Sequence, residues 1–191
     1  MLTFVEKYRD NGKYSQNGEW GILLECLNRI KPTIKTSVEF GCPDFTYCSN
    51  TAQLEELGWF CSMYDINPNP DPRIINMKIT PENVNSEIGN PTVLSIDVDN
   101  DDYHIWKAYK GQPDIVIIEI NSSVPPHVPM IPGTRGASYQ SMTELGISKG
   151  YFLLAHTGNF IFVADRFRPL FPEVYGDPLT EYFLYFNDSF L

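Results

Sequence analysis

The chain has 191 residues, a length that favours one domain. Apolar residues make up 42% and charged residues 20% of the chain, which excludes wholesale disorder. The 14 Lys and Arg residues against 24 Asp and Glu give a net charge of −10. A surface this acidic repels phosphate backbones and anionic lipids, so the composition argues against a nucleic-acid partner and against a membrane-surface role.

Neither the N-terminus nor the cysteines indicate export. Residues 1–13 carry mixed charge without an apolar run, and no stretch approaches the roughly 20 apolar residues of a membrane span. The cysteines form no C-x-x-C pair and have no histidine at zinc-ligand spacing; they are Cys26, Cys42, Cys48 and Cys61. We therefore expect reduced thiols and a cytoplasmic protein.

Hydrophobic spacing predicts helices and strands that alternate along the chain. A helix is expected over residues 18–31, because Trp20, Leu23 and Leu27 fall on one stripe and Pro32 ends it. Further helices are expected from Ser49 or Asn50 to Leu57, from Thr80 to Ile88, from the acidic run to Lys110, and over 138–149. Strands are expected over 37–41, 59–64, 73–79, 92–96, 114–120, 152–155 and 160–164.

This alternation predicts an α/β fold of the Rossmann-like kind, with right-handed crossovers and a mostly parallel sheet. The last two strands are joined only by Thr157 and Gly158, a hairpin-length link, so one strand runs antiparallel to its neighbour. In such sheets a ligand binds beyond the carboxyl ends of the strands. The candidate functional residues are therefore those just after each strand.

The first two strand ends have the pattern of a nucleoside site. Gly41 follows the first strand and would let the backbone approach a ligand, and Asp65 follows the second and could accept hydrogen bonds from a ribose diol. The pattern G-x-G-x-x-G is absent. The alternative interpretation is a tight turn and a solvated Asp65.

The fourth and fifth strands end in acidic and amide side chains. Asp97 and Asp99 follow the fourth strand, while Glu119 and Asn121 end the fifth. If these strands are neighbours, Asp97, Glu119 and Asn121 converge, as ligands for a hard cation or as a general base of raised pKa. The alternative is that the acidic residues turn the chain and that residues 100–102 cap the next helix. That alternative does not explain Glu119, whose carboxylate interrupts an apolar run.

Other polar features carry weaker signals. His104, His127 and His156 are isolated, and we interpret each as structural or solvated. The stretch 133–138 precedes a helix and could cradle an anion, but it lacks the Lys-Ser/Thr pair of a P-loop.

Several segments resemble a known family. They are YSQNGEWGILLECL, SVEFGCPDFTYCSNTAQLEELGW, ITPENVN, VLSIDVDNDDYHIWKAY, PDIVIIEINSS and GASYQSMTELGISKGYFLLAHTGNFIFV. In this order, from about Tyr14 to Arg166, they resemble small FkbM-type S-adenosylmethionine-dependent methyltransferase-like proteins. The resemblance implies a class I methyltransferase fold, in which seven strands have the order 3-2-1-4-5-7-6. Residues 1–166 would form that domain.

The resemblance also implies roles for individual residues. Glu39, Gly41 and Asp44 would line the methionine and ribose side of the cofactor, Asp65 would bind the ribose hydroxyls, and Asp97 would lie near the transferred methyl group. Asp97, Glu119 and Asn121 match the positions of catalytic or metal-ligating groups in metal-assisted O-methyltransferases. The expected activity is methylation of a hydroxyl on a sugar or small metabolite, with S-adenosylmethionine and a divalent cation such as Mg²⁺ as cofactors.

One departure from the family pattern leaves other functions open. Phe45 stands where relatives have glycine and could narrow the cofactor cleft, which would suit a binding or assembly protein without turnover. A metal-dependent hydrolase using the same acidic cluster is a third possibility. The aromatic-rich residues 167–191 lie outside the resemblance, and we expect them to pack on the domain or to form a homodimer.

Overall fold

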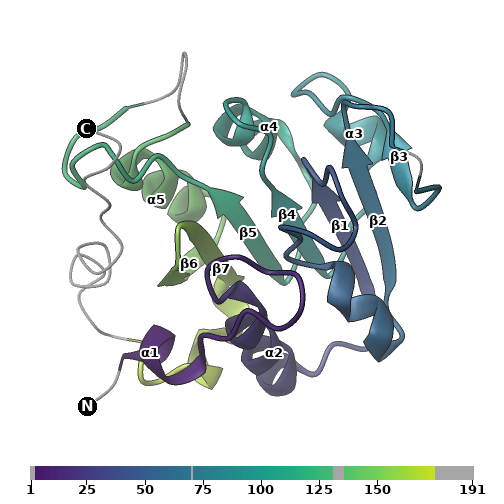
Figure 1. The fold of residues 1–191 in the computed structure, drawn as a ribbon. Helices are drawn as coiled ribbons and strands as arrows, with labels where there is room; N and C mark the ends of the chain where they lie inside the picture. Colours follow the sequence, from purple (N-terminus) through teal and green to yellow (C-terminus); the bar gives the residue numbers. More distant parts are fainter. Residues whose placement is uncertain (1–2, 70, 131–135, 175–191) are drawn as a thin grey trace.

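A computed structural model describes residues 3–69, 71–130 and 136–174 (Figure 1). A seven-stranded sheet with the order β3-β2-β1-β4-β5-β7-β6 forms its centre. The strands are β1 (Thr36–Phe40), β2 (Phe60–Asp65), β3 (Ile74–Asn76), β4 (Val93–Ile96), β5 (Ile115–Glu119), β6 (Tyr151–His156) and β7 (Asn159–Ala164). Strand β7 is antiparallel to both β5 and β6, and the other pairs are parallel. The predicted α/β, Rossmann-like fold and its strand order are confirmed.

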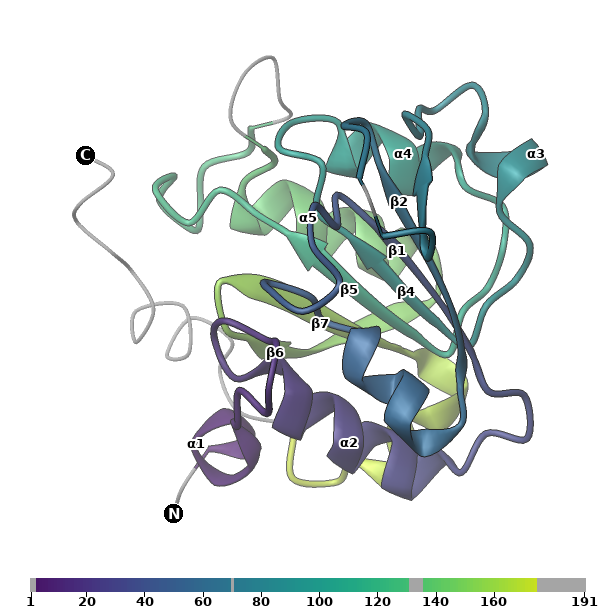
Figure 2. The ribbon, with the colours of Figure 1, turned by 45° about the vertical axis from the view of Figure 1, so that its right-hand side comes forward.

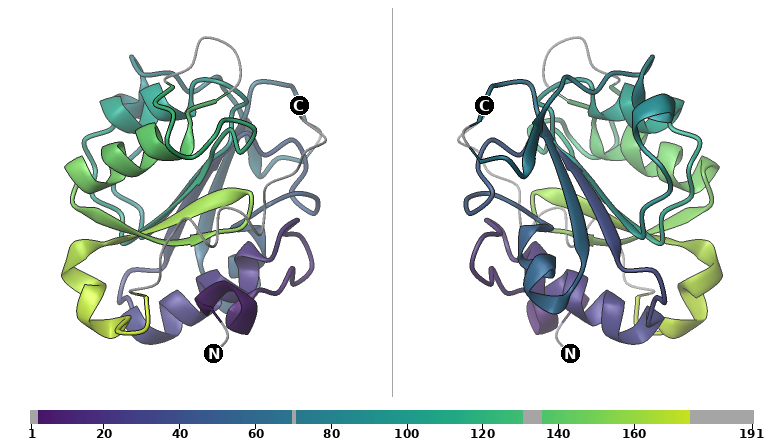
Figure 3. Two further views of the ribbon diagram at one scale, coloured as in Figure 1. Left: turned by 90° about the vertical axis from the view of Figure 1, so that its left-hand side faces the viewer. Right: turned by 90° about the vertical axis from the view of Figure 1, so that its right-hand side faces the viewer.

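Helices cover both faces of this sheet (Figures 2 and 3). The α-helices are α1 (Phe4–Tyr8), α2 (Glu19–Ile30), α3 (Val84–Glu87), α4 (Asp102–Ala108) and α5 (Tyr139–Ser148), and the 3₁₀ helices are η1 (Ala52–Leu57) and η2 (Asp165–Leu170). One apolar core joins the sheet to α3, α4 and α5, and a second joins it to α1, α2 and η1. The sheet is therefore the middle of three layers.

Strand β5 illustrates why the sheet is buried on both sides. Its residues Ile115 to Ile118 have no exposed surface. Successive side chains of a strand point to opposite faces, and accordingly Val116 and Ile118 join the core of α3, α4 and α5, whereas Ile115 and Ile117 join the core of α2. Burial on both faces explains the continuous apolar run in the sequence.

Several element boundaries differ from those predicted. Helix α3 begins at Val84 instead of Thr80, because the side chain of Asn83 accepts a hydrogen bond from the Thr80 N–H and closes a turn there. Helix α1 was not expected from the sequence, since five residues are too few to show a helical period. A capping box between Thr3 and Glu6 stabilises it.

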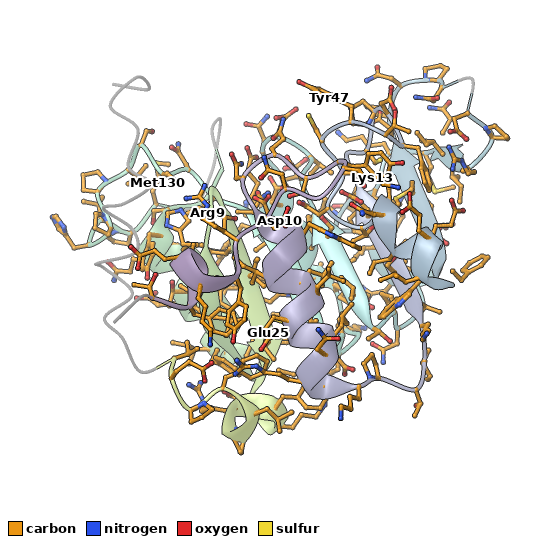
Figure 4. All side chains as sticks on the ribbon, turned by 60° about the horizontal axis from the view of Figure 1, so that its bottom comes forward. Arg9, Asp10, Lys13, Glu25, Tyr47 and Met130 are labelled. Carbon is orange, nitrogen blue, oxygen red and sulfur yellow. The ribbon has the colours of Figure 1, made fainter. Side chains whose placement is uncertain are left out.

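The segment between α1 and α2 also contacts η1, on the same face of the sheet. Figure 4 labels Arg9, Asp10 and Lys13 along this segment, with Asp10 close to the N-terminal end of α2. The backbone N–H of Lys13 donates to the side chain of Gln53 in η1 at 2.8 Å, and its ammonium group pairs with Glu56 at 2.7 Å. The segment therefore reaches η1.

The start of the C-terminal extension packs on the domain. The predicted boundary after residue 166 falls inside η2, and Phe171 is buried, with its ring 6.0 Å from that of Phe4 and 5.9 Å from that of Phe152. Residues 175–191 lie outside the described part of the chain, so a homodimer through this tail stays a prediction. No helix among the described residues is both long and apolar enough to cross a bilayer.

Candidate functional site

A cavity of about 540 Å³ opens at the carboxyl ends of the parallel strands. Gly41, which follows β1, and Asp65, which ends β2, line it together with Asp97 and Glu119 from the ends of β4 and β5. Tyr64 and Ile79 contribute apolar surface. The rule that ligands bind beyond the carboxyl ends of such strands therefore locates this cavity correctly.

Gly41 is required where β1 turns into the cavity. Its φ of 73° is left-handed, and its N–H donates to the carbonyl of Tyr64 at 2.9 Å. A Cβ at this position would lie 1.5 Å from the backbone oxygen of Asp97. The turn after β1 therefore touches the chain beyond β4 directly, and only glycine leaves room for that contact.

Glu39 stabilises the loop behind the cavity and does not line it. Its side chain is buried and accepts hydrogen bonds from the Ser49 hydroxyl at 2.7 Å, the Asn50 N–H at 2.8 Å and the Thr51 hydroxyl at 2.7 Å. Burial raises the pKa of Glu39, and these hydrogen bonds oppose the rise. The helix expected from Ser49 or Asn50 begins only at Ala52, as η1.

Asp44 and Phe45 also lie away from the cavity lining. Asp44 is exposed and accepts hydrogen bonds from the N–H and hydroxyl of Thr46 at 2.7 and 2.8 Å, which lower its pKa. Phe45 is buried against Met63 and Ile74 in a small separate core. The aromatic ring therefore does not narrow the cleft as the sequence had suggested, and this support for a protein without turnover is lost.

Asp65, the last residue of β2, lines the cavity. It is 6% exposed. One carboxylate oxygen accepts from the Asn67 N–H at 2.7 Å, and the Asp65 carbonyl accepts from the Met77 N–H at 2.9 Å. These hydrogen bonds fix the position of the Asp65 carboxylate at the carboxyl end of β2.

Three carboxylates meet at the ends of β4 and β5. One oxygen each from Asp97, Asp99 and Glu119 lies within 4.8 Å of the others. Burial, followed by the nearby charges of Asp102 and Asp99, raises the pKa of Asp97 to about 7. Burial, followed by the charge of Asp97, raises the pKa of Glu119 to about 8. The predicted convergence of Asp97 and Glu119 is present, and near neutral pH the pair can hold a proton.

Asp102 stabilises the acidic loop after β4 through hydrogen bonds to its backbone. Its buried carboxylate accepts from the N–H groups of Val98 and Asn100 at 2.8 and 3.1 Å. Burial raises its pKa to about 6, against the effect of these hydrogen bonds. The expectation that residues 100–102 cap α4 is corrected in part, because Asp101 occupies the N-cap position without a side-chain capping bond.

Asn121 comes two residues after Glu119, and its side-chain oxygen is engaged in a local turn. Its side-chain oxygen accepts hydrogen bonds from the N–H and the hydroxyl of Ser123, and Asn121 does not line the cavity. The chain leaves the sheet at this point and turns, so the alternation of β5 does not continue to Asn121. This oxygen serves the turn.

The sequence did not single out some of the lining residues. Gln16 reaches the cavity because buried Glu19 holds the residues on either side of it, accepting from the Ser15 hydroxyl at 2.6 Å and the Asn17 N–H at 2.9 Å. Lys78, after β3, is the only cation among the described lining residues. The segment YSQNGEW carries the sequence pattern of a helix start, which marks Gln16 as lying in a turn. That pattern does not predict that Gln16 lines the cavity, because its position depends on tertiary packing.

The histidines lie outside the cavity lining. His104 is half-buried, His127 is exposed and His156 is buried, with its Nε2 3.2 Å from the Ser122 hydroxyl oxygen. Burial lowers the pKa of His156 to about 4, so this ring is neutral at physiological pH. Residues 133–135 of the proposed anion cradle at 133–138 lie outside the described part of the chain.

Comparisons with known proteins add little to this geometry. No family model matches the chain, and no curated protein matches it. One similar solved structure is a variant of LepI in complex with SAH and a substrate analogue, at 13% identity and a TM-score of 0.47. The match covers 74% of this chain and 46% of that protein, so this chain spans less than half of its length. The fold assignment rests on the strand order.

Proposed function

We propose that this protein is an S-adenosylmethionine-dependent O-methyltransferase that acts on a hydroxyl of a sugar or small metabolite. The observation that carries the proposal is one cavity that contains the glycine turn after β1, the carboxylate after β2 and the acidic pair after β4 and β5. Each of these features suits a different part of an adenosyl cofactor and its reaction. The FkbM-type resemblance of the sequence agrees with this assignment.

The residues present fit the cofactor chemically. Asp65 offers a carboxylate oxygen to a ribose diol, and Gly41 removes the side chain that would keep a ligand from the backbone. Ile66 and Ile79 give the same cavity apolar walls that suit an adenine ring. The negative charge of Asp97 and Asp99 favours a cationic sulfonium nearby.

The acidic pair supplies the proton chemistry that methyl transfer to a hydroxyl needs. The bound cofactor supplies an electrophilic methyl group on a sulfonium. Asp97 or Glu119 would accept the hydroxyl proton if the methyl group passed from the sulfonium to the oxygen, a reaction that would leave SAH and a methyl ether as products. A well-placed base contributes about 10²–10⁴-fold, and positioning the hydroxyl about 3–3.5 Å from the methyl carbon contributes more.

A divalent cation is the alternative partner of these carboxylates. Asp97, Asp99 and Glu119 would hold it through oxygen ligands, which suit Mg²⁺. Such an ion would stabilise the alkoxide, and the carboxylates would then act as ligands instead of as a base. Asn121, whose side-chain oxygen serves Ser123, is not part of this proposed set.

Calorimetry with SAH is the first test of the proposal. The wild type should bind, and Asp65→Ala should weaken binding at least tenfold, because the ribose loses its acceptor. Asp114→Ala is the matched control, since Asp114 precedes β5 and so lies at the other end of this strand from Glu119, which lines the cavity. A wild type that gives no heat at high SAH concentration contradicts the proposal.

A transfer assay with methyl-labelled S-adenosylmethionine distinguishes the enzyme classes. Label transferred to a hydroxyl compound identifies an O-methyltransferase, and Asp97→Asn should then lower kcat by about 10²–10⁴-fold while SAH binding is kept. Substrate cleavage without label transfer would indicate the hydrolase instead. If the protein binds SAH but transfers label to none of the hydroxyl compounds tested and cleaves none of them, a binding protein is favoured.

A further inference from the structure

Two loops that touch each other contribute to the cavity wall. The loop after β1 contributes Gly41, Pro43 and Cys48 to the lining, and the loop after β2 contributes Ile66 and Asn67. Neither loop has the regular hydrogen bonds of a helix or strand. The contacts that hold the two loops together therefore position this part of the cavity lining.

Phe45 anchors the first loop from behind. It lies between the lining residues Pro43 and Cys48, yet its side chain is 4% exposed and packs in the small core with Met63 and Ile74. The loop thus lines the cavity through Pro43 and Cys48, while the Phe45 side chain between them packs against β2 and β3. Burial of the Phe45 ring stabilises the position of the loop. A glycine at this position could not do so, because glycine has no side chain to bury.

The guanidinium group of Arg73 stacks on the ring of Phe45. The guanidinium carbon lies 3.5 Å from the centre of the Phe45 ring, which is a close cation–π contact. The same guanidinium holds Asp71 through Nε at 2.9 Å and Nη2 at 2.5 Å, and Glu55 in η1 through Nη1 at 3.2 Å. Arg73 therefore connects the second loop, η1 and the ring that anchors the first loop.

A second contact joins the two loops at the same place. The side-chain amide of Asn69 donates to the carbonyl of Pro43, and its oxygen accepts from the Asp71 N–H at 2.8 Å. Asp71 in turn accepts from the Arg73 N–H at 3.0 Å. The loop after β2 is thus folded so that it contacts the loop after β1 at Pro43 and at Phe45.

We propose that Arg73 is a positioning residue for the adenosyl site, because its stack on Phe45 holds the two cavity-wall loops in the position that the ligand needs. This inference rests on the proposed function. Arg73 does not line the cavity, so its effect is exerted through Phe45 and the loop that carries Pro43 and Cys48. Lysine would not replace it, since an ammonium group lacks the planar fork that stacks and binds Asp71 together.

The test compares two arginines in matched surroundings. Arg168 also stacks on a buried ring, that of Phe152 at 4.3 Å, and also pairs with an aspartate, Asp165. Arg73 and Arg168 have the same side-chain exposure of 43%, but Arg168 lies in η2, beside the opposite edge of the sheet (Figure 1). Arg168→Gln therefore controls for loss of an exposed arginine and its stack.

Calorimetry with SAH and hydrogen exchange provide the measurements. Arg73→Gln should raise the Kd for SAH about five- to tenfold and speed amide exchange over residues 41–49, whereas Arg168→Gln should leave both within about twofold of the wild type. Phe45→Leu should weaken binding in the same direction. The double variant of Phe45 and Arg73 should bind no more weakly than the weaker single variant, since both changes remove one contact.

Each outcome decides the inference. If the wild type binds SAH and Arg73→Gln binds equally well, or if Arg168→Gln weakens binding as much, the positioning role is wrong and the proposed function stands. If the wild type does not bind SAH, the proposed function and this inference are both wrong. Should Arg73→Gln not fold, Phe45→Leu against Arg168→Gln makes the same comparison.

Discussion

Asp97 and Glu119 face each other across the carboxyl ends of β4 and β5. The register pairs Ile96 with Ile118, so the next residue of each strand brings these two carboxylates side by side, with Asp99 within the same 4.8 Å cluster. Partly buried carboxylates at this separation repel one another, because the interior screens charge less than water does. The folded protein therefore favours a proton, or a cation, between them.

Stability should fall as the pH rises from about 4 to about 8. The folded protein keeps protons on Asp97, with a pKa of about 7, and on Glu119, with a pKa of about 8. The unfolded chain releases them near pH 4, so the folded state binds more protons across this interval and ΔG of unfolding decreases with pH. Glu119→Gln should be more stable than the wild type by about 1–2 kcal/mol near pH 8 and equal to it near pH 4.

Urea unfolding at the two pH values measures this difference. Glu144→Gln, on the exposed face of α5, is the control, because it removes a solvated carboxylate and should change stability by less than about 0.5 kcal/mol at either pH. A wild type whose stability does not fall over this interval would show that the carboxylates are not electrostatically strained in solution.

Millimolar Mg²⁺ should raise the Tm if a divalent cation is the natural partner of this cluster. The rise should be about 3 °C near pH 8 and smaller near pH 6, because Asp97 and Glu119 must lose their protons to become ligands. Asp99→Asn, which removes one carboxylate of the cluster, should abolish most of the rise. Equal shifts in wild type and variant would instead indicate nonspecific ion effects.

The sequence predicts those parts of the site that local strand geometry determines. Asp65 and Glu119 end their strands, while Gly41 and Asp97 directly follow theirs. Parallel strands bring their carboxyl ends together, so these four residues line one cavity. The strand order itself came from the family resemblance, because alternation along the chain does not specify which strands are neighbours.

Other parts of the site depend on tertiary contacts that no local pattern reveals. Gln16 reaches the cavity only because Glu19 binds its neighbours, and Phe45 turns away from it because Met63 and Ile74 provide a place to bury the ring. Asn121 follows the period of β5 in the sequence, but the strand ends at Glu119 and the amide serves a turn. The two-residue period of a strand therefore predicts the direction of a side chain only within the strand, and not beyond its last residue.

Gly41→Ala should destabilise the protein far more than Gly58→Ala. Both glycines are left-handed, with φ of 73° and 77°, so both substitutions carry a similar backbone strain of about 1 kcal/mol. A Cβ at Gly58 meets nothing within 4 Å, whereas one at Gly41 lies 1.5 Å from the Asp97 oxygen. We expect Gly41→Ala to cost about 3 kcal/mol or more in denaturant unfolding. Similar losses for both variants would mean that the close approach of β1 to β4 relaxes easily.

Glu19→Gln should be the most damaging isosteric change in α2. Glu19 has no exposed surface, and its two oxygens accept from four donors: the Ser15 hydroxyl, the Asn17 N–H, the Thr157 hydroxyl and the Asn159 side-chain amide. An amide has one oxygen, so glutamine would set an NH₂ group against one hydroxyl, which can turn to accept from it, and one N–H donor, which cannot and would lose its partner. The expected cost is about 2–4 kcal/mol.

The same change at Glu25, in the same helix, provides the comparison. Glu25 is 22% exposed and pairs with Arg29 at 2.7 Å, so Glu25→Gln should cost less than about 1 kcal/mol. Because Glu19 fixes both sides of Gln16, Glu19→Gln should also weaken SAH binding when measured at a temperature where the variant is fully folded. Loss of stability without any loss of SAH affinity would show that Gln16 makes no contribution to the adenosyl site.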